Sequence, residues 1–128
     1  MSYYFARTLD APFEATVART RETLAAEGFG VLTEIDIQAT FQAKLGIAFR
    51  PYLILGACNP KLAFEALQLE PNVGTMLPCN VVVQDAGAGR TEVTAINPLA
   101  SMLAIENAKL HEHAARVAEK LRDAVNRL

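Results

Sequence analysis

The sequence contains no tryptophan, few other aromatic residues, only two cysteines and no strong excess of charge of either sign. Aromatic residues make up 7% of the 128 positions, and the formal net charge at pH 7 is −2. A protein that binds nucleic acid usually carries a basic surface or a set of aromatic side chains on which bases stack. We therefore expect no nucleic-acid partner. A chain of this length needs no disulfide or structural metal to fold. We also expect no cofactor and no resident metal.

Long hydrophobic runs are absent as well. No apolar stretch approaches the roughly 18 residues that cross a bilayer. The first residues lack the basic start and apolar run of a secretory signal peptide. We therefore expect a cytoplasmic protein with no membrane partner, in which Cys58 and Cys79 are reduced thiols.

The composition is that of a folded protein. Hydrophobic residues make up 52% of the chain and charged residues 20%, which excludes intrinsic disorder. The length is that of one ordinary domain. Because no internal repeat or linker is visible, we predict a single domain over residues 1–128.

Strand-like and helix-like segments alternate along the chain. Alternating or continuous apolar residues predict strands at 3–9, 31–37, 52–57, 79–84 and 91–96. Asn59-Pro60 and Asn97-Pro98 each combine a capping residue with a first-turn proline, which indicates helix starts. The last two strands form a hairpin, which requires antiparallel pairing. We therefore predict a two-layer α+β fold, in the order β-α-β-α-β-α-β-β-α, with helices on one face of a mostly antiparallel sheet.

The C-terminal segment carries a continuous apolar stripe. Leu103, Leu110, Val117 and Ala124 recur every seven residues, which predicts one helix from residue 98 to the end. Unbroken, that helix would be about 46 Å long, whereas a compact domain of this size has a radius of gyration of about 14 Å. The helix therefore either breaks once or overhangs its own core. An overhanging stripe would be covered by a second copy, so a homodimer is expected.

Three segments together resemble a known family. They are residues 29–36 (Phe-Gly-Val-Leu-Thr-Glu-Ile-Asp), 52–60 (Tyr-Leu-Ile-Leu-Gly-Ala-Cys-Asn-Pro) and 74–83 (Gly-Thr-Met-Leu-Pro-Cys-Asn-Val-Val-Val). In this order they resemble the bacterial and archaeal family called domain of unknown function 302, over nearly the whole chain. The resemblance implies a TATA-box-binding-protein-like shape and a homodimer. It implies no particular activity, and the shape alone does not imply DNA binding.

The two cysteines are the first candidates for a functional site. Cys58 and Cys79 are each followed by asparagine, and each lies at the end or the start of an expected strand. If the two strands are neighbours, the thiols could approach each other or share a soft metal such as Cu(I), with Met76 as a third donor. Alternatively, both are small buried hydrophobic residues without a chemical role.

Three polar residues are further candidates. Glu34 lies on an otherwise apolar strand, where it either contacts a ligand in a pocket or marks the solvent face. Asn80 begins a strand, where asparagine is disfavoured, so it could orient a ligand or tie down the preceding loop. Asn107 lies in the apolar stripe, where it could set register or face a pocket. His111 and His113 are two positions apart and form no helical metal pair, so no function is assigned to them.

These observations favour a small-ligand- or partner-binding homodimer with a pocket between the sheet and the C-terminal helix. The candidate ligand-binding residues are Glu34, Cys58, Met76, Cys79, Asn80 and Asn107. The alternative is a thiol-dependent redox or soft-metal protein that uses the two cysteines, which requires a lowered pKa in at least one thiol. A third possibility is an interaction module whose interface is the C-terminal stripe. No phosphate-binding glycine loop or nucleophile elbow is present, so catalysis is not expected.

Overall fold

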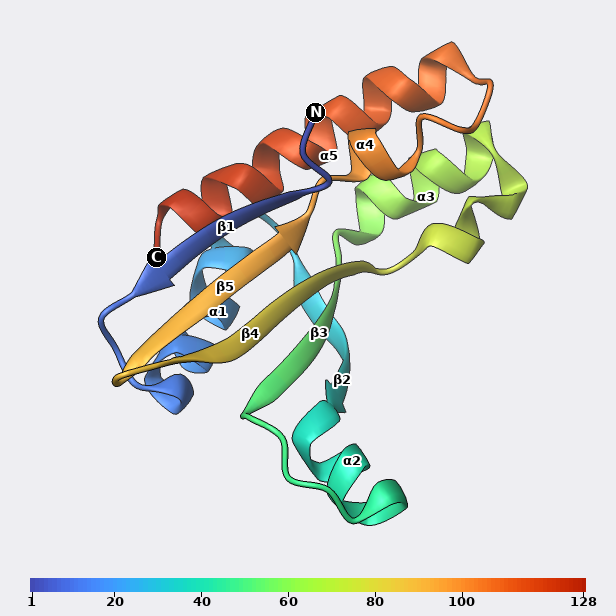
Figure 1. Cartoon of the computed structure of the whole chain (residues 1–128). Helices are drawn as coiled ribbons and strands as arrows, with labels where there is room; N and C mark the ends of the chain where they lie inside the picture. Colours follow the sequence, from blue (N-terminus) through green and yellow to red (C-terminus); the bar gives the residue numbers. More distant parts are fainter.

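Five antiparallel strands form one sheet in the order β1-β5-β4-β3-β2 (Figure 1). The computed structural model describes residues 1–128. The strands are β1 (Tyr4–Leu9), β2 (Gly30–Asp36), β3 (Tyr52–Cys58), β4 (Cys79–Gly87) and β5 (Arg90–Ile96). Each predicted strand is present, and the β4–β5 hairpin is confirmed.

The helices lie mainly on one face of this sheet. They are α1 (Phe13–Ala26), α2 (Ile37–Leu45), α3 (Pro60–Leu69), α4 (Pro98–Ser101) and α5 (Ala108–Asn126), with a 3₁₀ helix η1 (Pro71–Met76). Helices α1 and α5 cover the sheet, α3 lies beside α5 beyond the strand ends, and α2 projects from the opposite end (Figure 1). The predicted α+β class, with helices on one face, is confirmed. None of the helices combines the length and apolar character needed to cross a lipid bilayer.

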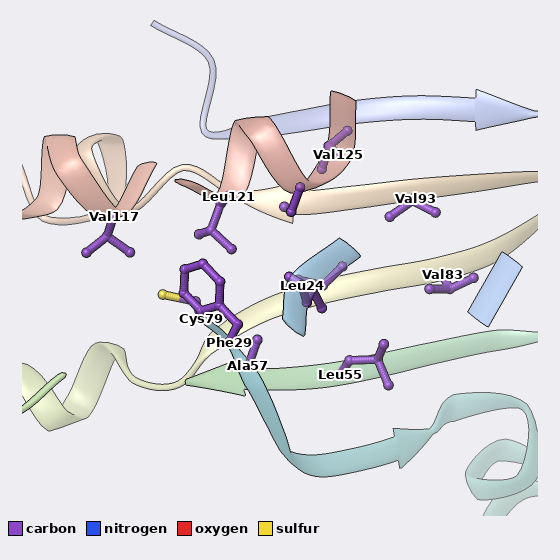
Figure 2. Packing of buried hydrophobic residues seen from close by; sticks show 13 residues of the cluster. Leu24, Phe29, Leu55, Ala57, Cys79, Val83, Val93, Val117, Leu121 and Val125 are labelled. Carbon is purple, nitrogen blue, oxygen red and sulfur yellow. The ribbon is translucent and has the colours of Figure 1, made fainter. Parts of the chain in front are cut away.

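The main core lies between the sheet and helices α1 and α5. Alternate residues of the strands point toward the helices, as the period of two requires. From the helices, Leu24 of α1 and Leu121 of α5 meet them and are 2% and 0% exposed (Figure 2). The strand residues that face these helices are Leu55, Val81, Val83, Val93 and Ala95.

The two Asn-Pro signals act as predicted. Oδ1 of Asn59 accepts a hydrogen bond from the amide of Leu62 at 3.3 Å and caps α3. Oδ1 of Asn97 accepts from the amide of Leu99 at 3.2 Å and caps α4. In both helices proline occupies the first turn, where its missing N–H costs no intrahelical bond.

The C-terminal segment is not one continuous helix. Of the two outcomes predicted for it, a single break or an overhang, the structure shows the break. The segment breaks between α4 and α5, and Asn107 begins α5 by accepting a hydrogen bond from the amide of Leu110 at 3.0 Å. Within α5 the apolar stripe is buried in its own chain, with Leu110 and Leu121 both 0% exposed, whereas Leu103, the first residue of the predicted stripe, lies before α5 and is 53% exposed. The helix therefore does not overhang, and a second copy is not needed to cover this stripe.

A bulge in β2 interrupts the alternation of its side chains between the two faces of the sheet. Strict alternation would place Val31, Thr33 and Ile35 on one face. The register shift between Val31 and Thr33 puts Val31 opposite Ala57, on the helix side, while Ile35 faces the other way. Beside the bulge, Thr33 occupies the space that a Cβ at Gly56 would need, so this close approach of β2 and β3 requires glycine.

Candidate functional site

A cavity of about 330 Å³ that is open to solvent on one side lies where β3 ends and β4 begins, bordered by α3, α4 and α5. Its size is at the lower end of the roughly 300–1,000 Å³ of small-molecule sites. Of its 17 lining residues, 13 are hydrophobic and two are prolines, which leaves only Asn59 and His113 as polar residues. No aspartate, glutamate, lysine or arginine lines it.

Small side chains create this space. The strand β3 contributes an alanine opposite Cys79, and the facing surfaces of α3 and α5 contribute three more. A larger side chain at any of these positions would reach into the cavity. The four lining alanines are Ala57, Ala63, Ala66 and Ala114.

The rim of the cavity is also apolar. Leu32 of the β2 bulge is 67% exposed and Leu67 of α3 is 39% exposed, and both are lining residues. Phe29, Cys79 and Val117 line the cavity as well, and all three belong to the main core (Figure 2). A ligand entering past the two leucines would therefore meet apolar surface along its whole path.

Both cysteines line the cavity, and both are free thiols. Because Ala57 pairs with Cys79, Cys58 is diagonally adjacent to Cys79 across the β3–β4 ladder. Burial raises the pKa of Cys79 from 9.0 to about 11, and the proximity of Cys58 adds to this shift. Burial raises the pKa of Cys58 as well. At neutral pH both side chains are therefore protonated.

His113 is a lining residue to which no function was assigned from the sequence. Its side chain is buried, and Nε2 has no hydrogen-bond partner. Nε2 lies 3.5 Å from Oε2 of Glu65, without hydrogen-bond geometry, and Arg116 approaches the same oxygen at 3.8 Å. Burial and then Arg116 lower the pKa of His113, while Glu65 and the backbone of Leu62 act in the opposite direction. The imidazole is therefore neutral at pH 7, and Arg116 is the cationic partner of Glu65.

The sequence did carry a signal for His113. It lies three residues after Leu110 and four residues before Val117, so helical spacing places it on the buried stripe of α5. A histidine on such a stripe is buried with its helix face, whatever its distance from another histidine.

Asn59 offers no free polar group to the cavity. Its Oδ1 is engaged by the α3 cap, and its Nδ2 donates to the carbonyl oxygen of Glu27 at 3.5 Å. The polar groups available on the cavity wall are therefore two protonated thiols and one neutral imidazole ring. No group of three His, Cys, Asp or Glu side chains is placed so that it could hold a metal ion.

Glu34 lies at a different site. It is on the helix side of β2, opposite Leu55, but at the sheet edge, where half of its side chain is exposed. It forms an ion pair with Arg21 of α1. Both residues line a second hollow of about 410 Å³ beside α1, away from the cysteines.

The remaining sequence candidates also lie outside the cavity. Met76 ends η1 and is 37% exposed, whereas the methionine that lines the cavity is Met102, which is 4% exposed. Asn80 is exposed on the face of the sheet without helices. Asn107 caps α5, and its Nδ2 donates to the carbonyl oxygen of Leu69 at 2.9 Å. Of the six predicted residues, the cavity brings together only Cys58 and Cys79.

Comparison with known proteins gives a family and a fold. The model of the family described as "Domain of unknown function DUF302" matches residues 5–128. The crystal structure of an uncharacterized conserved DUF302 protein from Bacillus stearothermophilus superposes with a TM-score of 0.91 at 30% sequence identity. The similarity covers 99% of this chain and 98% of that chain. No protein with a curated description matches. The resemblance inferred from the three sequence segments is confirmed.

Proposed function

This chain belongs to the DUF302 family, and we propose that it binds a small, predominantly apolar molecule in the cavity between α3, α5 and the end of the sheet. The observation that carries the proposal is the lining: 13 of 17 residues are hydrophobic and none bears a formal charge. Filling such a site removes apolar surface from water, which contributes about 25 cal/mol per Å² of buried apolar area.

Hydrogen bonds at both ends of α3 hold this helix in place, which supports a cavity that already exists before a ligand binds. The end of α3 is tied to the start of α5 by Nδ2 of Asn107 and the carbonyl oxygen of Leu69. The start of α3 is tied to the end of α1 by Asn59 and Glu27. Because both ends of α3 are held in this way, the helix is restrained from moving into the space left by the alanines.

The raised thiol pKa values favour a binding role over thiol chemistry. Thiol nucleophiles and metal ligands react as thiolates. With the pKa of Cys79 at about 11, its thiolate fraction at neutral pH is negligible. We therefore propose that Cys58 and Cys79 contact the ligand as apolar side chains of the cavity wall.

The proposal includes a cytoplasmic homodimer. Helix α2 has no buried residue, and Leu45 and Ile47 at its end are 65% and 47% exposed. A projecting helix with apolar side chains is the kind of surface that a second copy covers. Two free cysteines suit a reducing compartment. Sedimentation equilibrium would show a dimer that Leu45→Glu dissociates, whereas a monomer at high concentration would contradict this part.

An uncharged, polarity-sensitive dye tests ligand binding. Prodan, an uncharged naphthylamine dye with two fused rings, should increase its fluorescence on binding to the wild-type protein. Ala63→Phe places a ring in the cavity from α3, at a half-buried position that tolerates a larger side chain. Ala115→Phe is the matched control, because Ala115 is exposed on α5 and is not a lining residue.

We expect the fluorescence increase to be lost in Ala63→Phe and retained in Ala115→Phe. Ala66→Val is a second blocking variant from the buried face of α3, for the case in which the new phenyl ring turns to solvent. Circular dichroism verifies that each variant is folded. No increase with the wild-type protein, or an increase that neither blocking variant lowers, would contradict the proposed function.

A further inference from the structure

We infer that the ligand is an uncharged aromatic molecule of one or two rings. This inference rests on the proposed function and names the chemical class that the same cavity selects. Three observations carry it: the absence of charge on the lining, the sulfur atoms and aromatic ring that surround the space, and the volume.

The charge of the ligand follows from what the lining lacks. An ion that enters a largely apolar site loses water and must gain a counter-charge or several hydrogen bonds to compensate. No charged residue lines the cavity. Glu65 and Arg116 form an ion pair next to His113, and neither partner is a lining residue. A carboxylate or an ammonium group would therefore be desolvated without compensation.

The aromatic character follows from the sulfur atoms. Cys58, Cys79 and Met102 reach the cavity from β3, β4 and the end of α4. Sulfur makes favourable contacts with aromatic rings, commonly at the ring edge. Phe29 adds an aromatic side chain to the same lining, and pairs of aromatic rings gain energy beyond their buried area. A saturated ligand of equal size would gain only the apolar contribution.

The volume limits the number of rings. An apolar cavity of about 150 Å³ accepts one benzene molecule. The cavity here, at about 330 Å³, is roughly twice that size. It has room for a substituted single ring or for two fused rings.

The three methionines provide a test. Only Met102 lines the cavity, whereas Met76 and Met1 do not, so ¹³C-methyl labelling of methionine gives one reporter and two internal controls. The protein is titrated at pH 7 with four compounds of nearly equal shape: benzyl alcohol, benzoate, benzylammonium and cyclohexylmethanol. We expect only the Met102 signal to move. Benzyl alcohol should bind about tenfold or more tightly than either ion, and a few-fold more tightly than cyclohexylmethanol.

Each outcome decides a separate point. Equal affinity for benzoate or benzylammonium and benzyl alcohol would overturn the uncharged class, and equal affinity for cyclohexylmethanol would overturn the aromatic class. In both cases a moving Met102 signal would leave the proposed function intact. If none of the four moves Met102 while the naphthylamine dye still binds, the single-ring size is wrong. If the dye does not bind either, the proposed function itself fails.

Discussion

Asn107 joins two walls of the cavity: its Nδ2 donates to the carbonyl oxygen of Leu69 at 2.9 Å, and its Oδ1 accepts from the amide of Leu110 at 3.0 Å. One side chain therefore begins α5 and holds the end of α3 beside it. The separation of these helices determines how much space the lining alanines leave.

Two substitutions at Asn107 separate its contributions. Asn107→Ala removes the cap and the bond to Leu69, so we expect the free energy of unfolding to fall by about 2 kcal/mol. Asn107→Asp keeps an acceptor for the Leu110 amide but has no donor for Leu69, so its loss should be smaller. Urea denaturation at pH 7 measures both. An aspartate variant as stable as the wild-type protein would show that the bond to Leu69 contributes nothing.

The buried thiol of Cys79 makes the free energy of unfolding fall as pH rises in the alkaline range. Its pKa is 9.0 when exposed and about 11 in the folded protein. Between these values the unfolded chain releases the thiol proton while the folded chain retains it, so stability falls as pH rises. The loss should reach about 2 kcal/mol by pH 11. Cys79→Ala should remove this part of the slope in urea denaturation from pH 8 to 11, and an unchanged slope would contradict the buried, protonated thiol.

The two thiols should react differently with alkylating agents. Cys58 is half-buried and Cys79 is buried, and both have a raised pKa. With iodoacetamide at pH 8, we expect slow modification of Cys58 and much slower modification of Cys79. Mass spectrometry of peptides measures both rates. Because Cys58 lines the cavity, bound naphthylamine dye should protect it. Faster reaction of Cys79, or no protection of Cys58, would count against the described site.

Much of the fold is predictable because its signals are local. The Asn59-Pro60 and Asn97-Pro98 pairs specify helix starts, and the alternation of 79–84 and 91–96 specifies the hairpin. The break before α5 has a weaker signal: Asn107 caps α5 as Asn59 and Asn97 cap their helices, but no proline follows it and the seven-residue apolar repeat continues through it. Asn107 also donates to the carbonyl oxygen of Leu69, which is 38 residues away in sequence. Such a tertiary contact is not written in the local pattern.

The site was less predictable for a similar reason. Cys58 and Cys79 line the same cavity because β3 pairs with β4, and one sequence does not specify strand order. The alanines that make the space carry no chemical signal, since alanine is equally common in filled cores. Met102 lines the cavity because it is buried in one cluster with Ala66 of α3, whereas Met76 at the end of η1 is exposed.

The central claim is that the alanine-lined space between α3 and α5 is a binding site, and the dissociation constant of prodan for the two phenylalanine variants tests it most directly. The account predicts that Ala63→Phe weakens binding by about tenfold or more, while Ala115→Phe stays within about twofold of the wild-type value. The same dissociation constant for wild type, Ala63→Phe and Ala115→Phe would contradict it.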